Sequence, residues 1–215
     1  PEMVSYARIP FEVNDCEEHR RLALETAEKS MILLKNKGGL LPLDKNKLKT
    51  IAVIGPNADD KRILLGNYHG TPSQYVTPLN GIRKALGKEV KVLYAEGCDL
   101  KNKEGNIWGG QPTQGFTEAI AVAERADAVI MCLGLSPALE GEEVEVANSD
   151  GAGDRSYIGL PGMQEELLKA VAVTGKPVVL ALFNGSRITI NWAQDNIPAI
   201  IEAWYPGEEG GTALA

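Results

Sequence analysis

Long apolar runs, paired cysteines and histidines are scarce in this 215-residue sequence. No apolar run approaches the ~20 residues that a membrane-spanning helix needs, so we expect no membrane segment. No basic stretch followed by an apolar one opens this sequence, so no secretion signal can be read in it. Cys16, Cys98 and Cys132 lie far apart without a CxxC or Cys/His pairing, so we expect three structural cysteines and no metal. The two histidines, His19 and His69, fall in a helical segment and in a separate loop.

Basic charge and nucleotide-binding fingerprints are also missing. The net charge is −7, and no basic face suited to phosphates is visible, which argues against a nucleic-acid partner. The sequence contains neither GxGxxG nor GxxxxGK[ST], and Pro56 removes a backbone donor from the first strand-end loop. No GxSxG occurs, and Ser136 precedes a proline. We therefore expect no nucleotide cofactor and no nucleophilic serine.

Apolar strands alternate with amphipathic helices along most of the chain. The strands show little in/out alternation, as expected where helices cover both sheet faces. This pattern predicts a doubly wound, mostly parallel open sheet of flavodoxin-like type, a three-layer α/β/α sandwich, preceded by an extended linker at 1–13. We expect strands at 50–55, 90–97, 128–134, 178–185 and 199–206, and helices at 14–36, 60–66, 77–86, 116–126, 162–174 and 187–194.

The strand-end loops are where a ligand would bind, because ligands meet open α/β sheets at the carboxyl ends of strands. The third of these loops begins at GLSPALEGEE and carries five carboxylates within twelve residues. One glutamate held in a cleft could act as a general acid/base. A calcium site or a solvated acidic loop is an alternative, although the spacing does not match an EF-hand. The residues alone leave the choice open among Glu140, Glu142, Glu143, Glu145 and Asp150.

Eight stretches, taken together and in order, resemble glycoside hydrolase family 3. They are HRRLALETAEKSMILLKNKGGLLPL, TIAVIGPNAD, GNYHGTPSQYVTPLNGI, YAEGC, GLSPALEGEE, GDRSYIGLPGMQEELLKAV, GKPVVLALFNGS and AIIEAWYPGEEGGTALA. The resemblance covers residues 14–215 and favours the β-xylosidase/β-glucosidase branch. It implies that 14–215 form the C-terminal α/β sandwich domain of a retaining, exo-acting β-glycosidase, incomplete at its C-terminal end.

The resemblance also implies which carboxylate carries the proton. In this branch the acid/base glutamate follows the glycine that ends the third strand in a G-L-x-x-x-x-E pattern, which here runs from Gly134 to Glu140. The acidic loop is longer than the family's compact E-x-E-G-x-D-R, so an alignment on Gly141 would nominate Glu142 instead. Glu143 remains a third candidate.

We also assign expected roles to residues near the sugar site and at the base of the acidic loop. By resemblance, Tyr68 and His69 would lie near the sugar cleft, although an ordinary exposed loop is the alternative. Trp108 could stack on a sugar face or simply pack against the protein. Asp154 and Arg155 are expected to be structural, anchoring the base of the acidic loop.

The sequence contains only half of the catalytic pair that the resemblance implies. Nothing resembles the family's (β/α)8 barrel or its Asp nucleophile, and the Pro1 start and the TALA end predict a piece of a longer polypeptide. We therefore expect this chain alone to be inactive, and the full-length enzyme to act on a β-linked oligosaccharide or an aryl or alkyl glycoside. A non-catalytic ligand-binding or interaction module is the alternative. Xyloside, glucoside and arabinoside preferences stay open.

Overall fold

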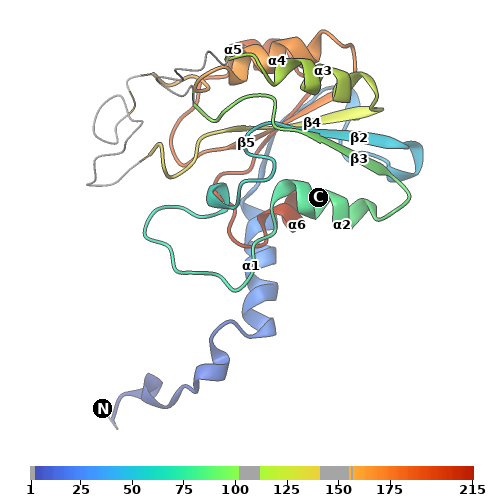
Figure 1. The fold of residues 1–215 in the computed structure, drawn as a ribbon. Coiled ribbons are helices and arrows are strands. Elements are labelled where there is room, and N and C mark those ends of the chain that lie inside the picture. Colours follow the sequence, from blue (N-terminus) through green and yellow to red (C-terminus); the bar gives the residue numbers. More distant parts are fainter. Residues whose placement is uncertain (1–2, 102–111, 141–154, 156) are drawn as a thin grey trace.

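A six-stranded sheet with helices on both faces forms the body of the molecule (Figure 1). The computed structural model describes residues 3–101, 112–140, 155 and 157–215. The strands lie in the order β1-β6-β5-β4-β2-β3, and all neighbours pair in parallel except β1 with β6. The strands are β1 Ile32–Asn36, β2 Thr50–Ile54, β3 Lys91–Ala95, β4 Ala128–Gly134, β5 Val178–Phe183 and β6 Ala199–Glu202.

The expected α/β class and the mostly parallel sheet are thus confirmed. All six residues of β5 and most of β4 are buried, which explains why their sequences are continuous apolar runs rather than alternating ones. Helices α3, α4 and α5 cover one face of the sheet, and α2 and α6 lie on the other (Figure 1). The helices are α1 Glu17–Ser30, α2 Pro78–Leu86, α3 Phe116–Glu124, α4 Gln164–Ala172, α5 Asn191–Asn196 and α6 Gly210–Leu214.

The order of the strands creates a switch point at β2. The chain passes from β2 to β3 on one side and then returns to β4 on the other side of β2. From β4 it continues outward through β5 to β6. Crevices for ligands form where such a reversal separates neighbouring loops, at the carboxyl ends of the strands. The loops that follow β2, β4, β5 and β6 are therefore the ones to examine for a site.

The prediction that the first helix continues to residue 36 is wrong. Helix α1 ends at Ser30, Met31 is already extended, and Ile32–Asn36 form β1. The apolar spacing of three and four persists through Leu34, so periodicity alone could not detect this change. Antiparallel pairing with β6 gives the backbone of this segment hydrogen-bond partners, and that pairing overrides the helical pattern. The helix expected at 60–66 is likewise only a 3-10 turn, Lys61–Leu64.

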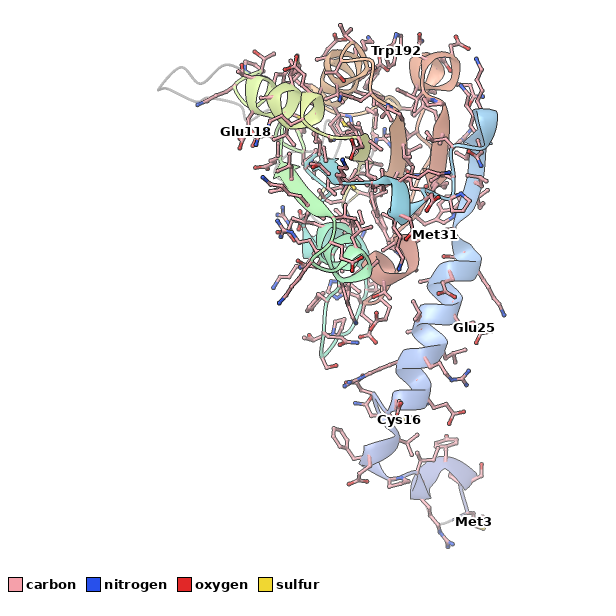
Figure 2. The ribbon with its side chains drawn as sticks, turned by 90° about the vertical axis from the view of Figure 1, so that its right-hand side faces the viewer. Met3, Cys16, Glu25, Met31, Glu118 and Trp192 are labelled. Atoms are coloured by element: carbon pink, nitrogen blue, oxygen red, sulfur yellow. The ribbon has the colours of Figure 1, made fainter. Side chains whose placement is uncertain are left out.

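Helix α1 and residues 3–16 before it form an arm that extends away from the sheet (Figure 2). Met3 lies at the far end of this arm, whereas Glu118 of α3 and Trp192 of α5 lie at the opposite end of the molecule (Figure 2). The arm contains two 3-10 turns, Ser5–Arg8 and Phe11–Val13, and neither has a buried residue.

Two of the cysteines belong to the core. Cys132 is fully buried on β4, as its apolar surroundings in the sequence predict, and Cys98 is buried after β3. Burial raises the pKa of the Cys98 thiol to about 12 and moves that of Cys132 in the same direction. Both therefore remain protonated packing residues at neutral pH. None of the helices in the described part of the chain is long and apolar enough to cross a membrane.

Candidate active site

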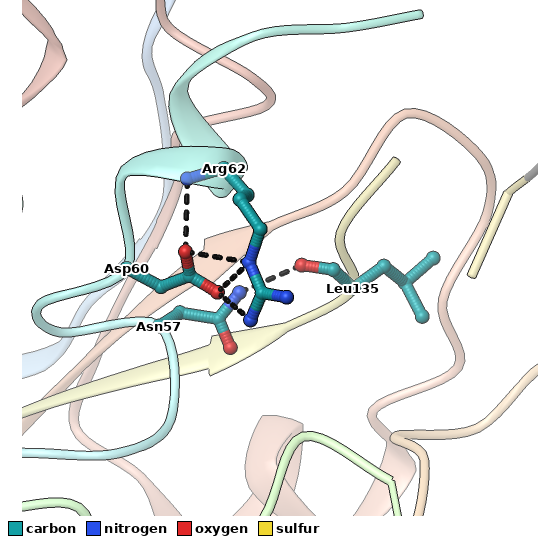
Figure 3. Close-up of polar contacts among 4 residues, drawn as sticks. All are labelled: Asn57, Asp60, Arg62 and Leu135. Atoms are coloured by element: carbon teal, nitrogen blue, oxygen red, sulfur yellow. Dashed lines mark hydrogen bonds and ion pairs between the residues drawn. The ribbon is translucent and has the colours of Figure 1, made fainter. Parts of the chain in front are cut away.

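The start of the loop that follows β4 is hydrogen-bonded on both sides, to β5 and to the segment after β2. Gly134, at the end of β4, has φ +141°, and a Cβ there would lie 2.0 Å from the carbonyl oxygen of Phe183 on β5. Only glycine permits this approach. The next residue, Leu135, is fully buried and donates its N–H to Phe183 O at 2.6 Å. On the other side, Asn57 donates from Nδ2 to Leu135 O at 2.7 Å (Figure 3).

The loop after β2 that supplies Asn57 is itself fixed by an ion pair. The carboxylate of Asp60 accepts hydrogen bonds from the backbone N–H of Arg62 at 2.9 Å and from its guanidinium at 2.6–2.9 Å (Figure 3). Asp60 thereby caps the short turn at Lys61–Leu64. The start of the β4 loop is thus positioned from both neighbouring strands.

Glu140 ends a compact turn in this loop. Leu139 N donates to Ser136 O at 2.9 Å, and Glu140 N donates to Pro137 O at 3.2 Å. These two bonds bring residue 140 back toward the sheet edge. The side-chain amide of Asn67, from the loop after β2, donates to the backbone carbonyl of Glu140. The position of Glu140 is therefore set by its own turn and by a loop more than seventy residues earlier in the sequence.

The carboxylate of Glu140 is bound by groups from two further strand ends. Its Oε2 accepts a hydrogen bond from Gly185 N, just after β5, at 3.1 Å. The same oxygen accepts a hydrogen bond from the hydroxyl of Tyr205, just after β6. A Cβ on Gly185 would lie 2.8 Å from the Tyr205 ring and 3.2 Å from Glu140 Oε2, so a glycine lets the three groups meet. The carboxylate lies where β4, β5 and β6 deliver their loops.

Burial keeps the Tyr205 hydroxyl a donor. Removal from water, and then the hydrogen bond to Glu140, raise the pKa of Tyr205 well above its ordinary value, while Arg155 acts in the opposite direction. Glu202, at the end of β6, is buried, and this burial raises its pKa as well. Its Oε1 accepts from Trp204 N at 3.3 Å.

Arg155, which follows the acidic loop, is hydrogen-bonded to the turn after β5. Its guanidinium donates to the carbonyls of Tyr157 at 3.1 Å, Gly159 at 3.0 Å and Arg187 at 3.0 Å, and to Ser186 Oγ at 3.2 Å. One side chain thus joins the segment after the acidic loop to the turn that follows β5.

The candidate sugar-contact residues are only partly described. Tyr68 is 84% exposed with φ +60°, and the Nδ1 of exposed His69 lies 2.6 Å from Gly70 O. Both follow Asn67, so their loop reaches the backbone of Glu140. Trp108, Glu142, Glu143, Glu145, Asp150 and Asp154 lie outside the described residues. Among the residues that are described, no three His, Cys, Asp or Glu side chains are grouped so as to hold a metal ion.

The partners of Glu140 were not predicted from the sequence. Tyr205, Gly185 and Asn67 all belong to stretches quoted for the resemblance, but none was assigned a contact with the acidic loop. The available signal was positional, because NGSR and YPGEEGG follow strands and must emerge at the same sheet edge as GLSPALE. Which loops are neighbours depends on the strand order, which the sequence did not supply.

Comparison with known proteins identifies the family to which this chain belongs. A model of the glycosyl hydrolase family 3 C-terminal domain matches residues 31–215. The chain belongs to glycosyl hydrolase family 3. Within that family it corresponds to the C-terminal domain, as the resemblance of the sequence motifs implied.

Relatives of this family 3 domain are xylosidases and glucosidases by name. A β-xylosidase from Formosa agariphila is 44% identical over 205 residues, which cover 93% of this chain and 26% of that protein. A periplasmic β-glucosidase from Salmonella typhimurium is 36% identical, covering 92% and 26% respectively. The solved structure of a β-glucosidase from Erythrobacter marinus superposes with a TM-score of 0.81 at 32% identity, covering 95% of this chain and 28% of that one. The family 3 chain thus spans about a quarter of the length of these relatives.

Proposed function

We propose that this chain is the second domain of a retaining, exo-acting β-glycosidase and that Glu140 is its general acid/base. The observation that carries the proposal is the position of the Glu140 carboxylate. It lies at the carboxyl edge of a doubly wound sheet, in contact with the loops that follow β5 and β6. This is the edge at which such sheets bind ligands. The family membership and the G-L-x-x-x-x-E spacing support the same residue.

In the proposed reaction Glu140 works with a carboxylate from another part of the polypeptide. An Asp on a (β/α)8 barrel domain attacks the anomeric carbon while Glu140 gives its proton to the departing glycosidic oxygen. Water then attacks the glycosyl-enzyme, and Glu140 takes a proton from that water. The two carboxyl groups would lie about 5–5.5 Å apart across the scissile bond. The substrate would be a β-linked oligosaccharide or an aryl or alkyl glycoside, with xylosides and glucosides favoured by the names of the relatives.

The test is a leaving-group series with Glu140→Gln in the full-length protein. Loss of a general acid costs typically 10²–10⁴-fold. We expect a loss of this size in kcat/KM for glycosides with poor leaving groups and a much smaller loss for activated aryl glycosides, which need no protonation. In Glu140→Ala, azide should restore turnover of the activated substrates by attacking the glycosyl-enzyme in place of activated water.

Two controls make the assignment specific. Glu118→Gln removes an exposed carboxylate from α3, on the sheet face that carries α4 and α5, and should leave the leaving-group dependence unchanged. Glu142→Gln tests the neighbouring candidate. If Glu142→Gln showed the selective loss and Glu140→Gln did not, the residue assignment would be wrong. If neither of these variants nor Glu143→Gln lost activity, the domain would be a non-catalytic module, the alternative that the sequence leaves open.

A further inference from the structure

Hydrogen bonds fix the chain on both sides of Tyr205, one of the partners of Glu140. The backbone on both sides of it is bonded to the sheet region, with Ala203 N donating to Leu182 O at 2.8 Å and Gly207 N donating to Leu64 O at 2.7 Å. Trp204, directly before it, has φ +58° and donates from its indole nitrogen to Ser30 O at 3.1 Å. A bulky residue in the left-handed region persists only where the surroundings enforce it. The hydroxyl of Tyr205 is therefore presented at a fixed place.

We propose that Tyr205 is a positioning residue for proton transfer by Glu140; this inference rests on the proposed function. Tyr205 Oη and Gly185 N both donate to one oxygen, Oε2. The other oxygen, Oε1, accepts no hydrogen bond from the described residues. Oε1 is the atom that gives its proton to the glycosidic oxygen and later receives one from water. The donors on Oε2 fix the plane of the carboxylate so that Oε1 faces the reacting bond.

The two donors also hold the carboxylate in place for the second half of the reaction, in which it must act as a base toward water. In the described part of the chain, Arg155 from the segment after the acidic loop and His19 of α1 are further charged or titratable groups near Tyr205. His19 lines a cavity of about 550 Å³ between α1 and the Trp204–Gly207 turn, together with Tyr205.

The decisive variant is Tyr205→Phe in the full-length protein, which removes one hydroxyl and keeps the ring. We expect kcat/KM for poor leaving groups to fall about tenfold, in line with one hydrogen bond to a charged group. The alkaline limb of its pH profile, which reports the essential acid of the free enzyme, should move up by about one pH unit. Gly185→Ala, which forces Tyr205 and Glu140 apart, should move the limb in the same direction.

Tyr94→Phe is the matched control. Tyr94 is a partly buried tyrosine on β3, at the edge of the sheet far from β6, and burial raises its pKa to about 12. Its substitution removes the same hydroxyl from the same kind of surrounding without touching Glu140. We expect an unchanged pH profile and an unchanged dependence on the leaving group.

A double-mutant cycle separates positioning from folding. In a Glu140→Ala background, Tyr205→Phe should cause no further loss in the azide-rescued rate, because the group that it positions is gone. An equal loss in both backgrounds, or an unmoved alkaline limb in Tyr205→Phe, would overturn the positioning role while leaving Glu140 as the acid/base. If Glu140→Gln shows no selective loss, the proposed function itself fails, whatever Tyr205→Phe does.

Discussion

At the scale of single residues, the side-chain amide of Gln164 makes three hydrogen bonds to backbone groups. It is fully buried at the start of α4, where its side chain replaces hydrogen bonds that a strand partner would otherwise supply. Its Oε1 accepts from Gly134 N at 2.7 Å, and its Nε2 donates to the carbonyls of Gly134 and Leu100 at 2.9 Å each. One amide thus satisfies three buried or half-buried backbone groups at the point where the Glu140 loop leaves the sheet.

Gln164→Leu should destabilise the protein strongly for its size. The side-chain volume is nearly kept, but one N–H and two carbonyls lose their partner, and each unsatisfied buried group costs about 1–3 kcal/mol. Partial relaxation toward water reduces the sum, so we expect a loss of about 2–4 kcal/mol in the free energy of unfolding, measured by urea denaturation. Gln194→Leu, on the exposed side of α5, should stay within about 0.5 kcal/mol. Equal effects at the two positions would contradict this account of Gln164.

The same scale shows what the sequence could predict of the candidate site. The resemblance nominates Glu140 through its spacing from Gly134. Both residues belong to one strand and its following loop, so the distance along the chain constrains the distance in space. Tyr205 lies sixty-five residues later, and its contact with Glu140 depends on β6 following β5 outward in the sheet. Periodicity defines a strand but not its neighbours, so this contact could not be predicted.

At the scale of elements, the contact between α2 and α6 depends on two glycines. A Cβ on Gly81 of α2 would lie 1.8 Å from Gly211 O, and a Cβ on Gly211 of α6 would lie 2.0 Å from Thr77 O. Gly211 N donates to Val76 O at 2.8 Å, so the two backbones are bonded as well as close. The backbone of α6 therefore contacts that of α2 directly and is hydrogen-bonded to the residue that precedes the N-cap of α2.

For Gly81→Ala, the packing cost of the added methyl group should therefore exceed the gain in helix propensity. Alanine favours the helix over glycine by about 1 kcal/mol, but inserting a methyl group into a rigid contact costs about 1–3 kcal/mol, and here the obstacle is backbone. We expect a net loss of about 1–2 kcal/mol in urea unfolding. Gly70→Ala meets no atom within 4 Å and should be nearly neutral. A stabilising Gly81→Ala would show that α6 can move away freely.

Most elements were predictable, and the exception at Ile32–Asn36 has a physical cause. Strands β2, β4 and β5 are apolar runs bounded by turn residues, and their pattern has one interpretation. The pattern of Ile32–Asn36 has two interpretations, because its apolar residues continue the spacing of α1 and also suit an edge strand. The choice between them depends on pairing with β6, more than 160 residues later. Local pattern determines an element only where no distant partner competes.

At the scale of the whole molecule, the carboxyl edge of the sheet gathers residues from distant parts of the sequence. Asn67, Glu140, Gly185 and Tyr205 follow four different strands and meet at one residue, because Gly185 and Tyr205 bind the Glu140 carboxylate and Asn67 binds the Glu140 backbone carbonyl. The parallel arrangement makes this possible, since every parallel strand delivers its following loop to the same side. The site is thus a property of the strand order rather than of any single motif. One carboxylate with its donors is still only half of what retaining hydrolysis requires.

The 215-residue chain should therefore show no glycosidase activity when it is produced by itself. A general acid without the nucleophile cannot form a glycosyl-enzyme, so we expect no release of nitrophenol from aryl β-xylosides or β-glucosides above the buffer rate, with or without azide. The full-length protein, assayed alongside, should hydrolyse them. The chain carrying Glu140→Gln controls for contaminating glycosidases, because any contaminant activity would be the same in both preparations. Activity in the chain that disappears in Glu140→Gln would mean that the second carboxylate also lies within these residues, and the division of the catalytic pair between two domains would have to be abandoned.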